Sequence, residues 1–145
     1  PFFFFFSQAL IGKGNFEFSF SGLKSAVLNY INNSKQKGEE YSQADVAACF
    51  QKAVVDVLVE KAVAAVNTTR TNKLVLAGGV AANSGLKKSL QIACDENNIK
   101  LYFPDNILCT DNAAMIACRA YYQSKMNIYA DLYLNANPSL KIGAL

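Results

Sequence analysis

The sequence predicts an α/β domain that is rich in helices and contains a short parallel βαβα unit. Three observations favour this fold class. An apolar run at Lys73–Ala77 ends in two glycines, and a helical pattern follows it. A second short run, Lys100–Phe103, is stopped by Pro104 and leads to another helical pattern. Because strands and helices alternate, we expect the two strands to be parallel.

Composition limits the possible chemistry. The 145 residues are 52% hydrophobic and 17% charged with a net charge of +3, which predicts a globular unit with a sizeable core. The chain has no histidine, which excludes Ser-His and Cys-His pairs and HExxH metalloprotease sites. Four cysteines without CxxC spacing favour a reducing, cytoplasmic location. No apolar run approaches the roughly 20 residues that cross a bilayer, so we expect no membrane span.

The first elements are predicted from a change of period. Phe16, Phe18 and Phe20 alternate with polar residues, as in a half-buried strand. Ser21 is a candidate N-cap for a helix that follows at once. The polar, glycine-containing segment Asn32–Glu40 predicts an exposed loop.

A long central helix is predicted next. Ser42 and Asp45 resemble a capping box, and Tyr41 is placed to pack on Val46. The apolar stripe continues for about six turns until the polar segment 67–69 ends it. We interpret this helix as a packing element without chemistry of its own.

The βαβα unit accounts for the rest of the predicted core. The strand Lys73–Ala77 is expected to be buried on both faces, and a helix is expected over Asn83–Asn97. After the second strand and Thr110, a third helix begins with Ala113–Ala117, which is apolar on nearly every side. That pattern predicts a helix buried all round.

The candidate site lies where the predicted strands end, because parallel sheets bind ligands beyond the carboxyl ends of their strands. Gly78 and Gly79 let the backbone turn sharply and approach a flat ligand. Asn83 offers a two-way amide to a ribose hydroxyl or a base edge. The alternative is that the glycines only form a tight turn and Asn83 only caps the helix.

Two further residues are candidates. Asp111 precedes the third helix and is either a hard oxygen ligand or a charge that favours the helix N-terminus. Lys24 opens the first helix and is either a contact to phosphate or a solvated surface residue.

Three segments together, FSFSGLK (Phe18–Lys24), LVLAGGVAAN (Leu74–Asn83) and CTDNAAMIA (Cys109–Ala117), resemble the C-terminal half of the TsaD/Gcp family. The resemblance covers about residues 15–122. It implies the C-terminal lobe of an actin-like or heat-shock-ATPase-like (ribonuclease H-like) fold. It also implies transfer of a threonylcarbamoyl group from threonylcarbamoyl-AMP to N6 of adenosine 37, in tRNAs that read codons beginning with A.

The resemblance assigns Gly78, Gly79 and Asn83 to the adenylate ligand, threonylcarbamoyl-AMP or ATP. It assigns Asp111 to one divalent metal, iron or zinc, whose two histidine ligands belong to an N-terminal half that these residues lack. Lys24 is then a possible contact to phosphate or tRNA. The implied partners are tRNA, the N-terminal lobe, a non-catalytic paralogue and a small ATPase of the same modification complex.

The expected organisation has three parts: an irregular Phe-rich start at residues 1–14 that departs from the family pattern, a nucleotide-binding lobe at 15–126, and a tail at 127–145. We expect this chain to be a fragment that is inactive alone and that self-associates through exposed apolar surface. An ATPase or kinase lobe of the same superfold and a non-catalytic scaffold paralogue are alternatives. The older description of the family as an O-sialoglycoprotein endopeptidase finds no catalytic residues here.

Overall fold

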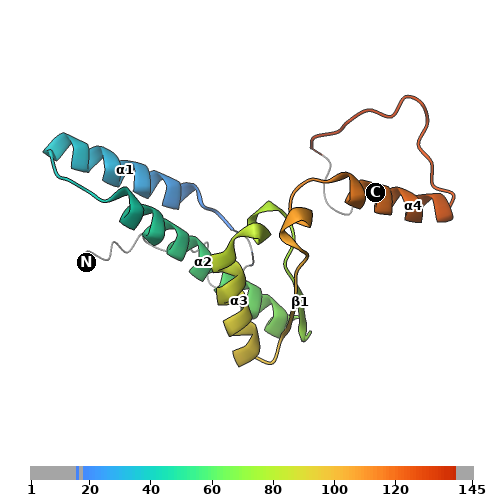
Figure 1. Ribbon diagram of the computed structural model, residues 1–145, viewed down its shortest axis with the longest axis horizontal. Helices are drawn as coiled ribbons and strands as arrows, with labels where there is room; N and C mark the ends of the chain where they lie inside the picture. The colour runs from blue at the N-terminus through green and yellow to red at the C-terminus, as the bar shows by residue number, and fades with distance from the viewer. Residues whose placement is uncertain (1–15, 17, 140–145) are drawn as a thin grey trace. The chain divides into compact units, whose positions relative to one another are not determined.

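The computed structural model describes residue 16 and residues 18–139. The chain divides into two compact units, Pro1–Thr110 and Asp111–Leu145. The predicted Phe-rich start at 1–14 lies outside the described residues, as does the end of the predicted tail. The described elements, labelled in part in Figure 1, are α1 (Ser21–Lys37), α2 (Gln43–Thr68), β1 (Lys73–Val75), η1 (Gly79–Ala82), α3 (Ser84–Glu96), β2 (Lys100–Tyr102), η2 (Asn106–Leu108) and α4 (Ala113–Lys125).

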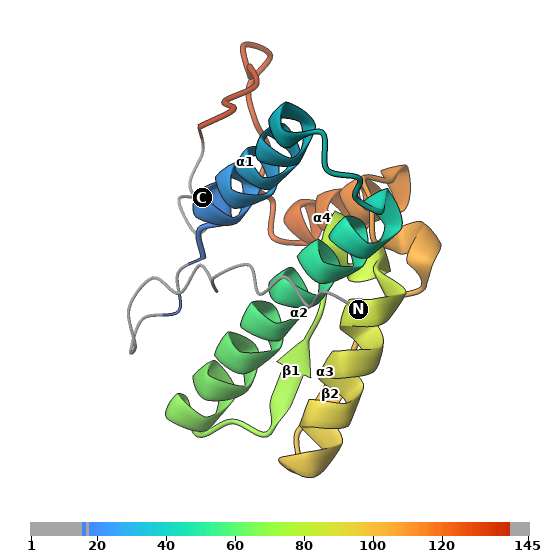
Figure 2. The ribbon, with the colours of Figure 1, turned by 90° about the vertical axis from the view of Figure 1, so that its left-hand side faces the viewer.

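The centre of the first unit is a two-stranded sheet covered by two helices. Strands β1 and β2 are parallel, with Leu74 opposite Leu101, which confirms the predicted pairing and the helix-rich α/β class. Helices α2 and α3 pack on each other and on the strands, as Figure 2 shows for α2, α3 and β1. The core is formed by two clusters of apolar residues that share Leu74 and Leu101: Val55, Leu86 and Leu90 in one, and Val66, Cys94 and Ile99 in the other.

The other face of the sheet is exposed, so the prediction that the Lys73–Ala77 strand is buried on both faces is wrong. Leu74 is half-buried, whereas Val75 is 70% exposed and its partner Tyr102 is 41% exposed. The sequence pattern anticipated two covering layers. Within the described part of the first unit, α2 and α3 supply only one, on the face that carries Leu74 and Leu101.

Helix α4 belongs to the second unit, and the prediction that it is buried all round is also wrong. None of its residues is buried, and Ile116 is 64% exposed. The described part of this unit contains one helix followed by irregular chain. So few residues cannot enclose an apolar helix, because burial needs surface from several elements. Asn112 caps the helix by accepting a hydrogen bond of 3.0 Å from the Met115 amide.

The described residues before α1, residue 16 and residues 18–20, do not form a strand, contrary to the alternation of the phenylalanines. Residues 18–20 have no strand conformation, and Phe18 and Phe20 stack their rings 6.2 Å apart. Alternation predicts which side chains share a face, but a strand also needs a neighbour to pair with. Helix α1 begins at Ser21 and Phe20 is at the N-cap position, so the prediction of Ser21 as the N-cap is wrong.

Helix α1 continues through most of the predicted loop at Asn32–Glu40. It ends at Gly38, whose φ of +68° is left-handed. Gly38 and Glu39 donate their amides to the Lys35 and Ser34 carbonyls, the pattern of a Schellman motif. An exposed helix face and a loop have similar polar compositions, so only the glycine indicates where helix α1 ends.

Helix α2 begins and ends close to the predicted positions. The Ser42 hydroxyl accepts a hydrogen bond of 3.2 Å from the Asp45 amide, which confirms the predicted cap. Tyr41 and Val46 line the same groove between α1 and α2, and the Tyr41 ring packs edge-on against Tyr30. No described helix is long and apolar enough to cross a membrane.

Candidate functional site

The backbone turns sharply at Gly78, at the carboxyl end of β1. The Leu76 amide donates to the Tyr102 carbonyl at 2.8 Å, so pairing with β2 continues to this point. Gly78 then adopts φ +91° and ψ 173°, a conformation open essentially to glycine alone. The requirement for a sharp turn therefore accounts for the glycine at position 78. The turn leads into the short η1 helix, where Ala81 is fully buried.

Gly79 differs from Gly78 because the turn does not require it. Its φ is not in the left-handed region, and a Cβ added there would meet no described heavy atom within 4 Å. Neither strain nor crowding within the described residues explains the absence of a side chain. The backbone at Gly79 is thus open to the approach of a flat group.

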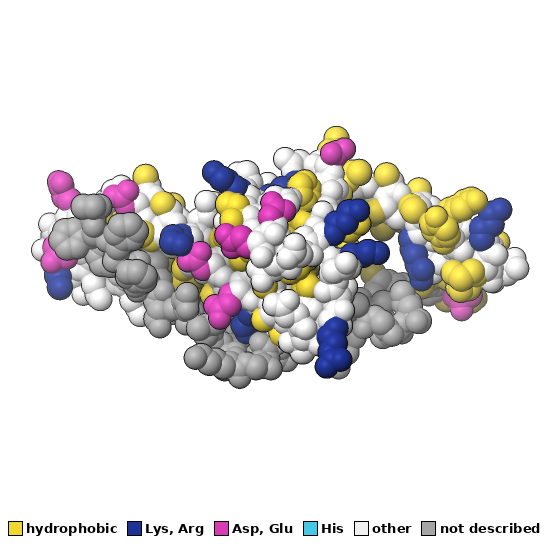
Figure 3. All heavy atoms as spheres, turned by 90° about the horizontal axis from the view of Figure 1, so that it is seen from below, with side chains coloured by type: hydrophobic (Ala, Val, Ile, Leu, Met, Phe, Trp, Pro, Cys, Tyr) yellow, Lys and Arg dark blue, Asp and Glu magenta, His cyan; other side chains and the backbone are white. Residues whose placement is uncertain are grey.

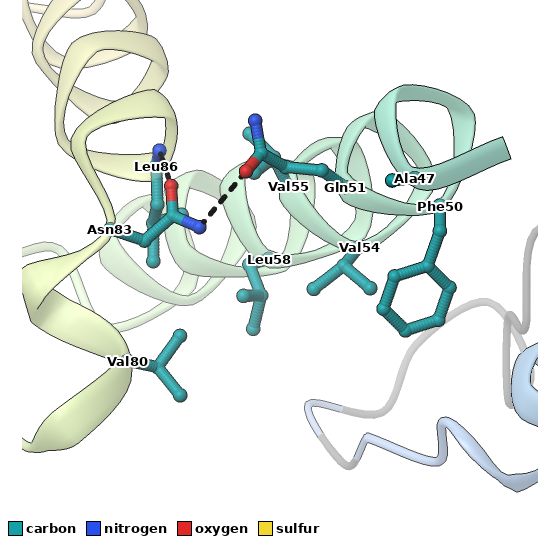
Figure 4. Close-up of a pocket in the computed structure, with 9 residues that line it drawn as sticks. All are labelled: Ala47, Phe50, Gln51, Val54, Val55, Leu58, Val80, Asn83 and Leu86. Carbon is teal, nitrogen blue, oxygen red and sulfur yellow. Dashed lines mark hydrogen bonds between the residues drawn. The ribbon is translucent and has the colours of Figure 1, made fainter. Parts of the chain in front are cut away.

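Asn83 is the N-cap of α3 and also joins α3 to α2. Its Oδ1 accepts a hydrogen bond of 3.0 Å from the Leu86 amide, which confirms the capping interpretation. Its Nδ2 donates to Gln51 Oε1 at 3.3 Å, as the dashed lines in Figure 4 show. The predicted contact of Asn83 with a nucleotide stays a prediction.

A pocket of about 250 Å³ lies beside Asn83, between α2 and the start of α3. Its walls are almost entirely apolar, and the Asn83 and Gln51 amides are the polar groups among its lining residues (Figure 4). Complete small-molecule sites are usually about 300–1,000 Å³. This pocket is therefore large enough for only part of a typical small-molecule ligand. Its lining residues are Ala47, Phe50, Gln51, Val54, Val55, Leu58, Val80, Asn83 and Leu86.

The loop after β2 leaves the same edge of the sheet, because the strands are parallel. Lys87 of α3 reaches this loop: its Nζ donates to Asn106 Oδ1 at 2.6 Å and lies 4.8 Å from the centre of the Phe103 ring. The loop folds into η2 and places Cys109 in a buried position. Lys87 therefore joins α3 to the loop that follows β2.

Asp111 belongs to the second unit, where it is exposed. It is not the cap of α4, because Asn112 has that position and accepts the bond from Met115. Asp111 therefore does not cap α4, while its charge still lies next to the N-terminus of that helix. Among the described residues, no three or more His, Cys, Asp or Glu side chains lie together so that they could hold a metal ion.

Lys24 is exposed on α1 and lines a second, larger pocket of about 370 Å³ between α1 and α2. Lys24 and Asn83 thus line different pockets, which share Ala47 and Phe50. The other residues of the α1–α2 pocket are mostly apolar. The described pocket lining contains no second basic residue beside Lys24 that would help to bind a polyanion. The contact of Lys24 with phosphate or tRNA stays a prediction.

Charges are distributed rather than concentrated on the visible surface. In Figure 3 the Lys and Arg side chains occur in separate groups among acidic and hydrophobic ones. The four cysteines are free thiols. Burial, together with the neighbouring Asp95 carboxylate, raises the pKa of the Cys94 thiol above its ordinary value, so that Cys94 is an uncharged core residue at neutral pH.

Sequence reasoning missed two residues of this region, Gln51 and Lys87. Gln51 lies on the helix interpreted as a packing element, and Lys87 lies on α3, where Asn83 is the only candidate site residue predicted from the sequence. Each contacts a residue that is distant in sequence, Asn83 at 32 positions and Asn106 at 19. Helical periodicity carries no signal for such pairs, because it reports only which residues share a face.

Comparison with known proteins gives a consistent result. The family model described as "TsaD: tRNA N6-adenosine threonylcarbamoyltransferase" matches residues 3–118. The chain is 49% identical to the protein of that name from Moorella thermoacetica over 137 residues, 94% of this chain and 40% of the relative. It is also 49% identical to those of Staphylococcus saprophyticus (90% of this chain, 38% of the relative) and Clostridium botulinum strain 657 (95% and 41%).

The chain thus spans about two fifths of the length of these curated relatives. The match includes α1–α3, both strands and the segment that opens α4. On the extent of the family match and the identity to these relatives, the chain belongs to the TsaD family of tRNA N6-adenosine threonylcarbamoyltransferases.

Proposed function

We propose that this chain is the C-terminal, nucleotide-binding lobe of a tRNA threonylcarbamoyltransferase with an actin-like, ribonuclease H-like fold. In the reaction, N6 of adenosine 37 attacks the carbonyl carbon of threonylcarbamoyl-AMP. A C–N bond forms, the C–O bond to the phosphate breaks, and AMP leaves as the amine loses a proton. Family membership and the parallel β1–β2 pair support this assignment.

The proposed role of the chain is to hold the adenylate at the carboxyl end of β1. The observation that carries this proposal is Gly79, where neither backbone strain nor a described neighbour excludes a side chain. A ligand that passes close to the backbone gives glycine a reason to be there. Gly78 sets the turn, and Asn83 offers the amide hydrogen that remains on Nδ2 and a free lone pair on Oδ1.

The proposed metal site is only partly formed by this chain. Asp111 presents an exposed carboxylate, the oxygen donor that a divalent iron or zinc accepts, and it is not used as a helix cap. Since the described residues contain no group of three ligands, Asp111 fits as one ligand of a site completed elsewhere. A bound metal supplies Lewis-acid polarisation of the threonylcarbamoyl carbonyl.

The partners proposed for the whole protein are tRNA, an N-terminal lobe, a non-catalytic paralogue and a small ATPase. We place the protein in the cytoplasm, which the four free thiols support. Residues 1–145 alone are expected to bind metal weakly and to transfer no threonylcarbamoyl group. Modified adenosine formed from tRNA and threonylcarbamoyl-AMP by these residues alone would contradict that expectation.

The nucleotide role is tested with Gly79→Ala in the whole enzyme. The new methyl group enters open space in the nucleotide-free protein, so the thermal unfolding temperature is expected to stay unchanged. AMP binding, measured by calorimetry, is expected to weaken at least about tenfold, because a displaced ligand loses several contacts. Gly22→Ala is the matched control, since a Cβ at Gly22 also meets nothing within 4 Å.

Equal AMP affinity in the Gly79→Ala, Gly22→Ala and unmodified proteins would mean that the adenylate does not bind at this loop. Transfer to tRNA is then measured separately. Steady ATP hydrolysis without tRNA modification would point instead to a phosphoryl-transfer enzyme of the same superfold.

A further inference from the structure

The side chain of Asn83 is held from two sides before any ligand arrives. Its Oδ1 faces the Leu86 amide at 3.0 Å, and its Nδ2 faces Gln51 Oε1 at 3.3 Å (Figure 4). A backbone N–H can only donate, so the Asn83 atom that faces Leu86 has to be the oxygen. The nitrogen must then face α2, where Gln51 supplies an acceptor.

These two bonds use half of the hydrogen-bonding capacity of Asn83. A side-chain amide has two N–H donors and two acceptor lone pairs. One N–H and one lone pair are left, and both belong to an amide plane whose direction is already fixed. A group held in this way loses little rotamer entropy when it binds a hydroxyl or a base edge.

Gly85 is a second, independent sign that the Gln51–Asn83 contact matters. A Cβ at Gly85 would lie 3.1 Å from Gln51 Nε2 and 3.2 Å from Asn83 Oδ1, closer than ordinary van der Waals contact. Glycine within a helix costs about 1 kcal/mol relative to alanine. The first turn of α3 therefore carries a residue unfavourable to the helix at the one place where the two amides need room.

We propose that Gln51 is a positioning residue that fixes the orientation of the Asn83 amide toward the nucleotide, and that Gly85 provides the space for it. This inference rests on the proposed role of Asn83 in binding the adenylate. Gln51 is exposed and contributes little to the core, so its contact with Asn83 is the interaction that a substitution removes.

The test is a double-mutant cycle on AMP affinity in the whole enzyme. Gln51→Met keeps the length of the side chain and removes the acceptor. AMP affinity is expected to fall about two- to twelvefold, the range set by one net hydrogen bond. Asn83→Ala is expected to weaken binding further, and adding Gln51→Met to it is expected to change nothing more.

A second measurement follows the Asn83 side-chain amide by NMR in the nucleotide-free protein. Gln51→Met is expected to shift its N–H resonances, and Gln51→Glu is expected to restore them because the carboxylate still accepts the bond. Gln91→Met is the matched control, since it removes the Gln91–Asp95 hydrogen bond on the surface of α3. It is expected to leave both the Asn83 resonances and AMP affinity unchanged.

The outcomes separate the two proposals. If Asn83→Ala weakens AMP binding but Gln51→Met changes neither affinity nor the Asn83 resonances, Gln51 does not position Asn83. Additive losses in the double variant also overturn the inference, because they make Gln51 an independent contact. If Asn83→Ala binds AMP normally, the proposed function of Asn83 fails, and the inference fails with it even where the resonances shift.

Discussion

Lys87 Nζ donates a hydrogen bond of 2.6 Å to Asn106 Oδ1 and so joins helix α3 to the turn that follows β2. The same ammonium group lies over the Phe103 ring, 4.8 Å from its centre. Helix α3 starts where the β1 loop ends, so Lys87 connects the helix that follows one loop to the other loop at the carboxyl edge of the sheet. We therefore expect the Lys87 side chain, as well as the two strands, to hold the β2 loop in place.

Removing this support is expected to loosen the β2 loop selectively. In Lys87→Met the hydrogen bond and the charge over Phe103 are lost while the apolar stem is kept. Amide hydrogen exchange at residues 104–109 is expected to become faster, and exchange in the core of α2 is expected to stay the same. Lys88→Met, at the exposed neighbouring position, is the control. Equal exchange in both variants would mean that the strands alone position the loop.

The two roles of Asn83 can be separated by comparing two substitutions. Asn83→Ala removes the cap and is expected to lower the free energy of unfolding by about 1 kcal/mol. Asn83→Asp keeps an oxygen that accepts from the Leu86 amide and adds a charge that favours the helix N-terminus, so stability is expected to be retained. AMP affinity is expected to fall in both variants, because each loses the amide N–H donors. Denaturant unfolding and calorimetry check the pair, and full AMP affinity in Asn83→Asp would leave Asn83 as a cap only.

Local signals predicted the boundaries of α2 and α3 well. The Ser42 cap, the Asn83 cap and the ends of α3 are set by residues within one turn, so the sequence pattern contains what is needed. The parallel pairing of β1 and β2 also followed from the order of strands and helix, because a crossover helix joins parallel strands.

Burial and the site contacts were not predictable from the same patterns. The alternation at Phe16–Phe20 and the apolar start of α4 indicate side chains that favour burial, but burial depends on which element covers them. The Gln51–Asn83 bond requires α2 and α3 to pack at one particular register. Only the folded arrangement determines that register, so Gln51 looked like any exposed residue of a packing helix.

Gly85→Ala is expected to separate stability from binding. The added methyl group favours the helix by about 1 kcal/mol, so the free energy of unfolding is expected to rise or stay constant. The same methyl group displaces the Gln51 amide, and AMP affinity is expected to fall as far as in Gln51→Met. Gly22→Ala makes the same exchange in α1 without a neighbour to displace and is expected to leave affinity unchanged. Tighter AMP binding in Gly85→Ala would contradict the spatial role given to Gly85.

Cys94 is expected to make stability fall at alkaline pH. The thiol is fully buried. Burial is the main cause that raises its pKa in the folded protein, and the neighbouring Asp95 carboxylate raises it further. An unfolded chain loses this proton near the ordinary value of about pH 8.5, whereas the folded chain still holds it. The unfolded state then binds fewer protons, so the stabilising contribution is complete below about pH 8.5 and is lost as pH rises toward the folded pKa.

Cys94→Ala removes the titrating group and isolates this effect from lysines and tyrosines that titrate in the same range. The variant is expected to be less stable than the unmodified protein near pH 7 because it loses packing in the core. That difference is expected to shrink near pH 9.5, because the unfolded chain has by then released a thiol proton that the folded chain holds more tightly. Urea unfolding at the two pH values measures it. A difference that stays constant would mean that the Cys94 thiol titrates alike in the folded and unfolded chains.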